Sequence, residues 1–161
     1  MIARTMIQLS EHGNTFDPQM GPEKLREATK LPDDDLVDAV EELEGRGLVR
    51  RQLALGAGPL GFVALSSEAA LFVELDKHFK EWNPADDALR IAADLINDAC
   101  NGHVQSTAEK YGWLPRRMNP AINYLIEHRH VESSRSLGSH PWCTPFIIKN
   151  SATRRFVRDR S

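Results

Sequence analysis

The chain has 161 residues, 41% of them hydrophobic and 27% charged, with a net charge of −3, as in an ordinary globular protein. No apolar run approaches the roughly 18 residues that a membrane-spanning helix needs, and the N-terminus lacks the basic-then-apolar plan of a secretory signal. The spacing of the two cysteines, Cys100 and Cys143, matches no zinc or redox motif, so we expect reduced thiols and no metal. Together these features predict a cytoplasmic protein with no cofactor and no membrane contact.

The first half of the chain predicts three helices and a hairpin. Apolar spacing predicts a helix over residues 2–12, ended by Gly13, and a second helix over residues 22–30. A third helix is predicted where apolar residues recur at i, i+3, i+4 and i+7, at Leu36, Ala39, Val40 and Leu43. The predicted strands are a short one at 15–17 and two at 48–55 and 62–66, joined by the turn 56–61.

Residues 66–82 link the two halves and carry an apolar stripe. Phe72, Leu75, Phe79 and Trp82 are spaced 3, 4 and 3 residues apart, which predicts another helix. This helix either packs on its own domain or bridges the two halves, or it forms a homodimer through the stripe.

The second half predicts the same order of elements. Asn83 and Pro84 are typical of a helix start, and this helix is expected to run to about Asn101. A short strand at 102–104 and a helix capped by Ser106 or Thr107 follow. The next helix is expected within residues 115–129 and has its apolar face at Met118, Ala121, Ile122 and Leu125. Asn119 is a candidate N-cap, which would put Pro120 at the first helical position. A hairpin over residues 131–149 and a tail with helical spacing at 153–160 complete this half.

An internal repeat relates the two halves at an offset of 82 residues. It aligns the apolar faces of the two third helices and also preserves a Leu-Gly turn and a proline. The matched positions are Leu36 with Met118, Ala39 with Ala121, Val40 with Ile122, Leu43 with Leu125, Val49 with Val131, Leu55-Gly56 with Leu137-Gly138, and Pro59 with Pro141.

The predicted order of helix, short strand, helix, helix, strand, turn and strand is that of a winged helix-turn-helix. The phrase AVEELEGRGLVRR at residues 39–51 resembles the recognition helix and first wing strand of bacterial winged-helix regulators of the MarR and ArsR kinds. The resemblance implies a mainly α fold with small β-hairpins (α+β), built as two tandem winged-helix domains. These would be residues 1–82, which include the linker helix 66–82, and residues 83–161.

The two halves differ in charge. Residues 1–85 carry 9 Lys/Arg against 15 Asp/Glu, whereas residues 86–161 carry 11 against 8. The third helix of the first half would repel DNA phosphates, because it bears seven carboxylates. They either stabilise the positive end of the helix dipole or bind a basic protein partner. The seven are Asp33, Asp34, Asp35, Asp38, Glu41, Glu42 and Glu44.

The third helix of the second half has the residues that a DNA-reading helix needs. We expect it to enter the major groove of duplex DNA, with Arg116, Arg117 and Arg129 on phosphates. Asn119, Asn123 and His128 are the candidate base contacts, and Tyr124 is expected to stack or to bond a phosphate. In the tail, Arg154, Arg155 and Arg158 form either a second phosphate anchor or a solvated last helix.

The predicted fold and its charges are compatible with two functions. The first is a DNA-binding transcriptional regulator, whose first domain serves dimerisation or partner binding. The alternative is a protein–protein adaptor, because tandem winged helices also resemble the chromosome-segregation protein ScpB. The pI of about 6.1 and the uncharged wings favour the adaptor. No enzyme is expected, since no Gly-rich phosphate loop or catalytic constellation is present.

Overall fold

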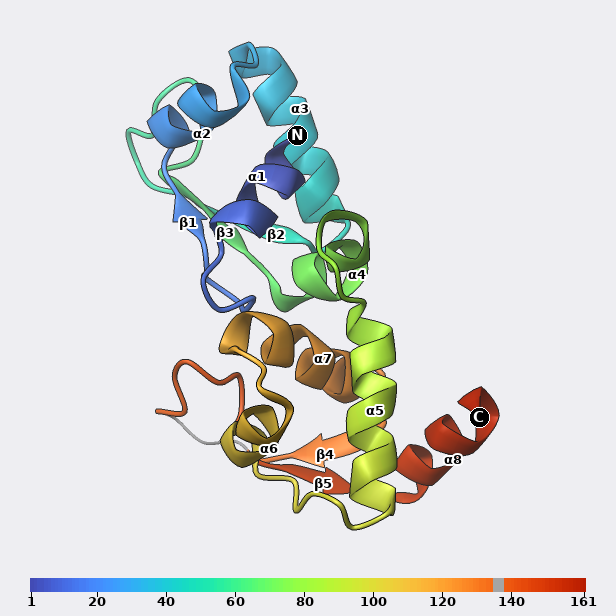
Figure 1. Cartoon of the computed structure of the whole chain (residues 1–161). Helices are drawn as coiled ribbons and strands as arrows, with labels where there is room; N and C mark the ends of the chain where they lie inside the picture. Colours follow the sequence, from blue (N-terminus) through green and yellow to red (C-terminus); the bar gives the residue numbers. More distant parts are fainter. Residues whose placement is uncertain (135–137) are drawn as a thin grey trace.

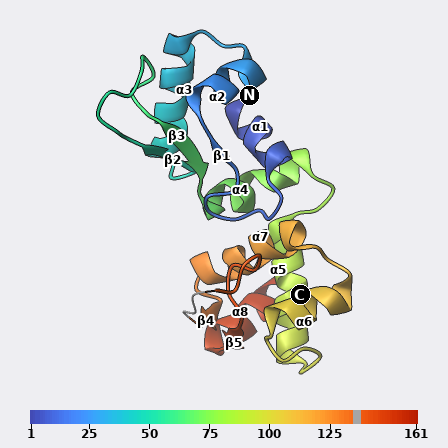
Figure 2. The same cartoon turned by 90° about the vertical axis from the view of Figure 1, so that its left-hand side faces the viewer.

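Figures 1 and 2 show a computed structural model of the chain, which describes residues 1–134 and 138–161. Over these residues the chain forms eight helices and two small antiparallel sheets, a mainly helical α+β architecture. Residues 1–82, the first unit, lie above residues 83–161, the second unit, in Figure 1. The expected match of Leu137 with Leu55 falls outside the described residues.

The first unit contains four helices and a three-stranded sheet. Strand β3 is central, with Met20 of β1 opposite Leu65 on one side and Val49 of β2 opposite Ser67 on the other. The elements are α1 (Ile2–Leu9), β1 (Gln19–Met20), α2 (Pro22–Thr29), α3 (Asp33–Gly45), β2 (Val49–Gln52), β3 (Ala64–Ser67) and α4 (Ala69–Phe79).

The second unit has a two-stranded sheet with Val131 opposite Lys149. An isolated bridge between His103 and Phe146 stands where the first unit has β1. The elements are α5 (Pro84–Ile96), α6 (Val104–Tyr111), α7 (Pro115–Glu127), β4 (Val131–Ser133), β5 (Ile147–Lys149) and α8 (Ser151–Arg160).

The two units share their order of elements. Helices α5, α6, α7 and α8 each begin 82 residues after α1, α2, α3 and α4. Each unit also has its own apolar core: one runs from Ile2 to Phe72, and the other from Ala88 to Phe156. Leu36 and Val40 of α3 are fully buried in the first core, and Met118 and Ile122 of α7 are fully buried in the second.

Several predicted boundaries are wrong in the first unit. The first helix ends at Leu9, because the Asp17 carboxylate accepts hydrogen bonds from the Ser10 hydroxyl (2.7 Å) and the His12 N–H (2.5 Å). These bonds fold the chain into a loop that includes residues 15–17, which were predicted to be a strand. The short strand forms later, as β1 at Gln19–Met20. The linker helix is also shorter than residues 66–82, since Ser66 and Ser67 belong to β3.

Two predicted helix caps in the second unit are wrong. Helix α6 begins at Val104, with His103 rather than Ser106 or Thr107 as its N-cap residue. Helix α7 begins at Pro115, the first residue of the expected range 115–129, so Asn119 is not a cap and Pro120 lies inside the helix. Asn83 is the N-cap of α5 as predicted, and its side chain accepts a bond from the Ala85 N–H at 3.0 Å. Among the described residues, no helix has the length and apolar composition to cross a bilayer.

Gly102 lets the second unit close its sheet. Its φ of +85° is in the left-handed region, and its carbonyl accepts a bond from the Ile147 N–H at 2.9 Å. A Cβ at this position would lie 2.1 Å from the Ile147 carbonyl oxygen. Gly112 also has a positive φ, +68°, but a Cβ there would meet nothing within 4 Å. Gly102 is therefore required by both conformation and space, whereas Gly112 is required by conformation alone.

We expect Gly102→Ala to lower the free energy of unfolding by about 3 kcal/mol or more, because strain and overpacking add. Gly112→Ala, the matched control, should cost only about 1 kcal/mol. Urea unfolding followed by circular dichroism measures both values. Equal losses in the two variants would show that the close approach to Ile147 is absent.

Candidate functional site

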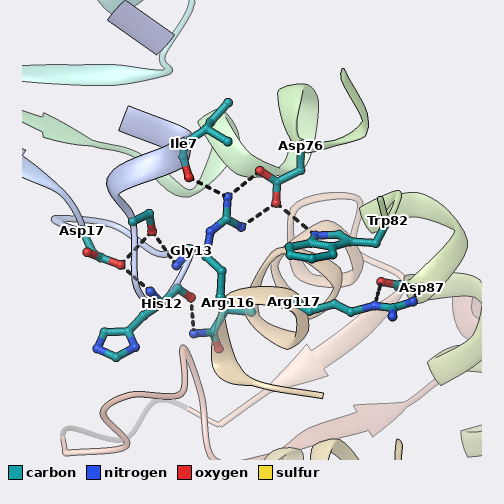
Figure 3. Close-up of polar contacts among 11 residues, drawn as sticks. Ile7, His12, Gly13, Asp17, Asp76, Trp82, Asp87, Arg116 and Arg117 are labelled. Carbon is teal, nitrogen blue, oxygen red and sulfur yellow. Dashed lines mark hydrogen bonds and ion pairs between the residues drawn. The ribbon is translucent and has the colours of Figure 1, made fainter. Parts of the chain in front are cut away.

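Helix α7 lies at the junction of the two units, and its first turn enters the first unit through Arg116 (Figure 3). The guanidinium donates two bonds to the Asp76 carboxylate of α4, at 2.6 and 2.8 Å, and a third to the Ile7 carbonyl of α1, at 3.2 Å. The Arg116 side chain is only 9% exposed, and that of Asp76 is fully buried. This bidentate pair joins the two units at a position that is almost entirely closed to solvent.

Aromatic side chains complete the environment of the pair. The guanidinium carbon of Arg116 lies 4.8 Å from the centre of the Phe72 ring and 5.8 Å from that of Trp82. The Trp82 indole N–H donates to the same Asp76 carboxylate at 3.4 Å. Asp76 therefore has polar partners on both oxygens, while the arginine is flanked by rings that favour a cation.

Asn119, one turn further along α7, makes a second polar link across the junction. Its amide nitrogen donates to the His12 carbonyl of the first unit and to the Pro141 carbonyl of the second, both at 2.8 Å. Its amide oxygen accepts a bond from the Cys143 N–H at 3.0 Å. The side chain is fully buried with its donors and acceptor used, so it ties three segments together.

Arg117 pairs within the second unit. It donates two bonds of 2.8 Å to the Asp87 carboxylate of α5, and its guanidinium carbon lies 4.3 Å from the Trp113 ring centre. The hydrogen bonds to Asp87 raise the pKa of Arg117, although partial burial opposes them. Unlike Arg116, this side chain is about one-third exposed.

Three of the α7 residues that were expected to contact DNA are not on an exposed face. Arg116, Asn119 and Asn123 are buried, and Asn123 lies next to Asn14 of the first unit. The face that looks free when the second unit is considered alone is covered by the first unit. These residues and the ion-paired Arg117 therefore cannot take the phosphate and base contacts predicted for them while the junction is closed.

The apolar stripe of residues 66–82 includes one acidic residue that could have indicated this junction. Asp76 lies between Leu75 and Phe79, four residues after Phe72, at a position where an apolar residue is expected. A carboxylate on an apolar stripe indicates a buried cation as its partner. In the single chain α4 packs on α1 of its own unit and on α5 and α7 of the other, so it bridges the units.

Helix α3 presents an acidic face to solvent. Its exposed carboxylates fall within an arc of about 120°, at roughly 100° per residue, opposite the buried Leu36 and Val40. Asp33 and Glu44, which flank this face, pair with Arg26 and Arg51, and hydrogen bonds from these arginines lower the pKa of each carboxyl. We call this set the acidic face: Asp34, Asp35, Asp38, Glu41 and Glu42.

The turn after β2 is apolar and open. Leu53 is 71% exposed, and Leu55 projects entirely into solvent. Arg51, just before this turn, bonds to Glu44 of α3 at 2.7 Å, so the turn begins beside the C-terminal half of the acidic helix. Leu53 and Leu55 are therefore two apolar side chains that are accessible to a partner.

The other predicted residues lie at the C-terminal end of α7 and on α8. Tyr124, His128, Arg129 and Arg155 line one groove between the end of α7 and α8. Arg154 and Arg158 are exposed on α8 outside this groove. The structure thus divides the predicted site residues into a buried set, a set in the groove and an exposed set, with Arg117 ion-paired and partly exposed outside all three.

Within residues 1–134 and 138–161, no three His, Cys, Asp or Glu side chains come together as ligands of one metal ion. Comparison of the chain with protein-family models, with curated proteins and with solved structures finds no match.

We expect Asp76→Ala to lower the free energy of unfolding by about 3–5 kcal/mol, because it leaves the Arg116 guanidinium buried without a counter-charge. Replacing both partners, with Arg116→Met and Asp76→Leu, should recover most of this loss. Denaturant unfolding measures both changes.

The matched control is Asp33→Ala, which breaks a bidentate pair with Arg26 that water can reach. Its loss should be much smaller, since exposed ion pairs contribute little. A loss as large as that of Asp76→Ala, or no recovery in the double variant, would contradict a buried charge at the junction.

Proposed function

We propose that the chain is a protein–protein adaptor built from two tandem winged-helix units. The shared order of helix, strand, helix, helix, strand, strand and helix supports the winged-helix assignment, although a bridge replaces the short strand in the second unit. The functional proposal rests on one observation: neither α3 nor α7 has an exposed face that is suited to bind duplex DNA.

Helix α7 is closed to DNA by the first unit. A recognition helix must expose one side to the major groove, about 12 Å wide, and its outward residues must be free to bond. The terminal nitrogens of the Arg116 guanidinium and the Asn119 amide nitrogen already donate inside the protein. The regulator hypothesis would require the units to separate, which breaks a buried ion pair.

Helix α3 is open but has the wrong charge for DNA. The five carboxylates of the acidic face would meet phosphates at short range, and one base contact of about 1–3 kcal/mol cannot offset that repulsion. The same face is complementary to a basic protein surface. The exposed Leu53 and Leu55 add apolar anchors beside it. We therefore propose a partner that is basic and carries apolar residues.

The test is a charge reversal of the acidic face with Asp34→Lys, Asp38→Lys and Glu42→Lys. Affinity capture from the native cell lysate should recover one protein with the wild-type chain and lose it with this variant, because the partner's cations would be repelled. The recovered protein, once purified, should bind the wild-type chain in a 1:1 complex that weakens as salt rises.

The matched control reverses three exposed carboxylates elsewhere, Glu11→Lys, Glu81→Lys and Glu132→Lys, and should retain the partner. Random duplex DNA should not bind the intact chain at 50 or 200 mM salt. Duplex binding that falls by orders of magnitude between these concentrations would instead support the regulator. Equal partner loss in both triple variants would contradict docking on the acidic face.

A further inference from the structure

A groove of about 540 Å³ runs between the C-terminal end of α7 and α8, which projects from one side of the second unit (Figures 1 and 2). Its size is within the range of small-molecule sites. It is lined by four aromatic or imidazole rings and three arginines, and its one carboxylate belongs to Asp159. The lining residues are Tyr124, His128, Arg129, His130, Ala152, Arg155, Phe156, Asp159 and Arg160.

The rings form one stacked cluster. Tyr124 and His128 stack at 4.2 Å between centres, His130 and Phe156 at 4.1 Å, and the two histidine rings lie nearly parallel at 5.8 Å. Burial lowers the pKa of His130, and the nearby His128 and Arg160 charges act in the same direction. His130 is therefore a neutral ring at pH 7, whereas His128 remains exposed at the edge of the cluster.

The cations of the groove outnumber its one anion. Arg129, Arg155 and Arg160 are all exposed, and Arg160 reaches the Tyr124 hydroxyl at 3.4 Å. Asp159 is paired at 3.1 Å with Arg158, which lies outside the groove. Three guanidinium groups beside a ring cluster are suited to phosphate, which arginine binds through paired hydrogen bonds.

The fold by itself does not require these residues. At the offset of 82, the first unit has Glu42, Arg46, Leu48 and Glu74 where the second has Tyr124, His128, His130 and Phe156. The first unit closes the same corner with an exposed Arg46–Glu74 ion pair. The ring cluster is thus an addition to the second copy.

Arg129 also departs from what the backbone prefers. Its φ of +55° is in the left-handed region, and its counterpart in the first unit is Gly47, with a φ of +73°. Placing a side chain there costs roughly 1 kcal/mol, so glycine would be the more stable choice. Strain of this kind is typical of functional positions.

We propose that this groove binds a nucleotide. Its phosphates would bond to Arg129, Arg155 and Arg160, and its base would stack on the exposed His128 ring. The Nδ1–H of His128 donates to the Tyr124 carbonyl at 3.0 Å, which holds the ring parallel to Tyr124 and leaves Nε2 for the ligand. The nucleotide is either free or part of a single strand, since both present a base beside a phosphate.

The test compares two double variants with the same change of charge. Arg155→Ala with Arg160→Ala removes two groove cations, and Arg4→Ala with Arg154→Ala, the matched control, removes two exposed arginines outside the groove and leaves the Arg158–Asp159 pair intact. Binding of ATP, inorganic pyrophosphate and a ten-residue thymidine single strand is measured by calorimetry at 50 mM salt. Thermal unfolding verifies that each variant is folded.

We expect the groove variant to bind its preferred nucleotide probe at least tenfold more weakly than wild type, and the control variant within threefold. His128→Ala should weaken that probe but not pyrophosphate. Tighter binding of ATP would identify a free nucleotide, and tighter binding of the thymidine strand would identify single-stranded nucleic acid. Equal losses in the two double variants, pyrophosphate bound as tightly as either nucleotide probe, or no binding of any probe would overturn the proposal.

Discussion

The arrangement of the two units depends on the buried pair between Arg116 and Asp76. Removing a guanidinium and a carboxylate from water is costly, and only close, bidentate geometry with further polar partners compensates for it. The Ile7 carbonyl and the Trp82 indole supply those partners. Because such a pair tolerates little displacement, it fixes one orientation of α7 against the first unit. Asn119 then fastens the loop at His12 and the segment around Pro141 to the same helix.

This junction explains why the chain carries one helix pattern twice with opposite charge. Arg116 and Arg117 occupy the positions that Asp34 and Asp35 hold in the first unit. In α3 the carboxylates stay in solvent, where they stabilise the positive end of the helix dipole. In α7 the arginines are used within the chain, one for the other unit and one for α5. The polarity of each copy therefore reflects what its third helix faces.

The surfaces that remain open lie on different units of the molecule. The acidic face belongs to α3 of the first unit, and the arginines and rings lie beside α8 on one side of the second unit (Figure 1). Charges this far apart interact weakly at physiological salt, where screening acts over about 8 Å. The partner proposed for the acidic face and the nucleotide proposed for the groove would therefore bind independently, although the chain as a whole is acidic. A rigid junction would keep the two surfaces at a fixed separation.

The sequence by itself determined the order of helices and strands and the apolar face of each third helix, because burial periodicity is local. It also determined the 82-residue repeat and the acidic face of α3, where charged residues cannot be buried. Only the tertiary structure decided that Arg116, Asn119 and Asn123 are interior and that Tyr124, His128 and Arg155 share a groove. A helix pattern separates apolar from polar faces, but it does not reveal whether a polar face meets water or another unit. That depends on partners such as Asp76 and His12, which lie 40 and 107 residues away in the chain.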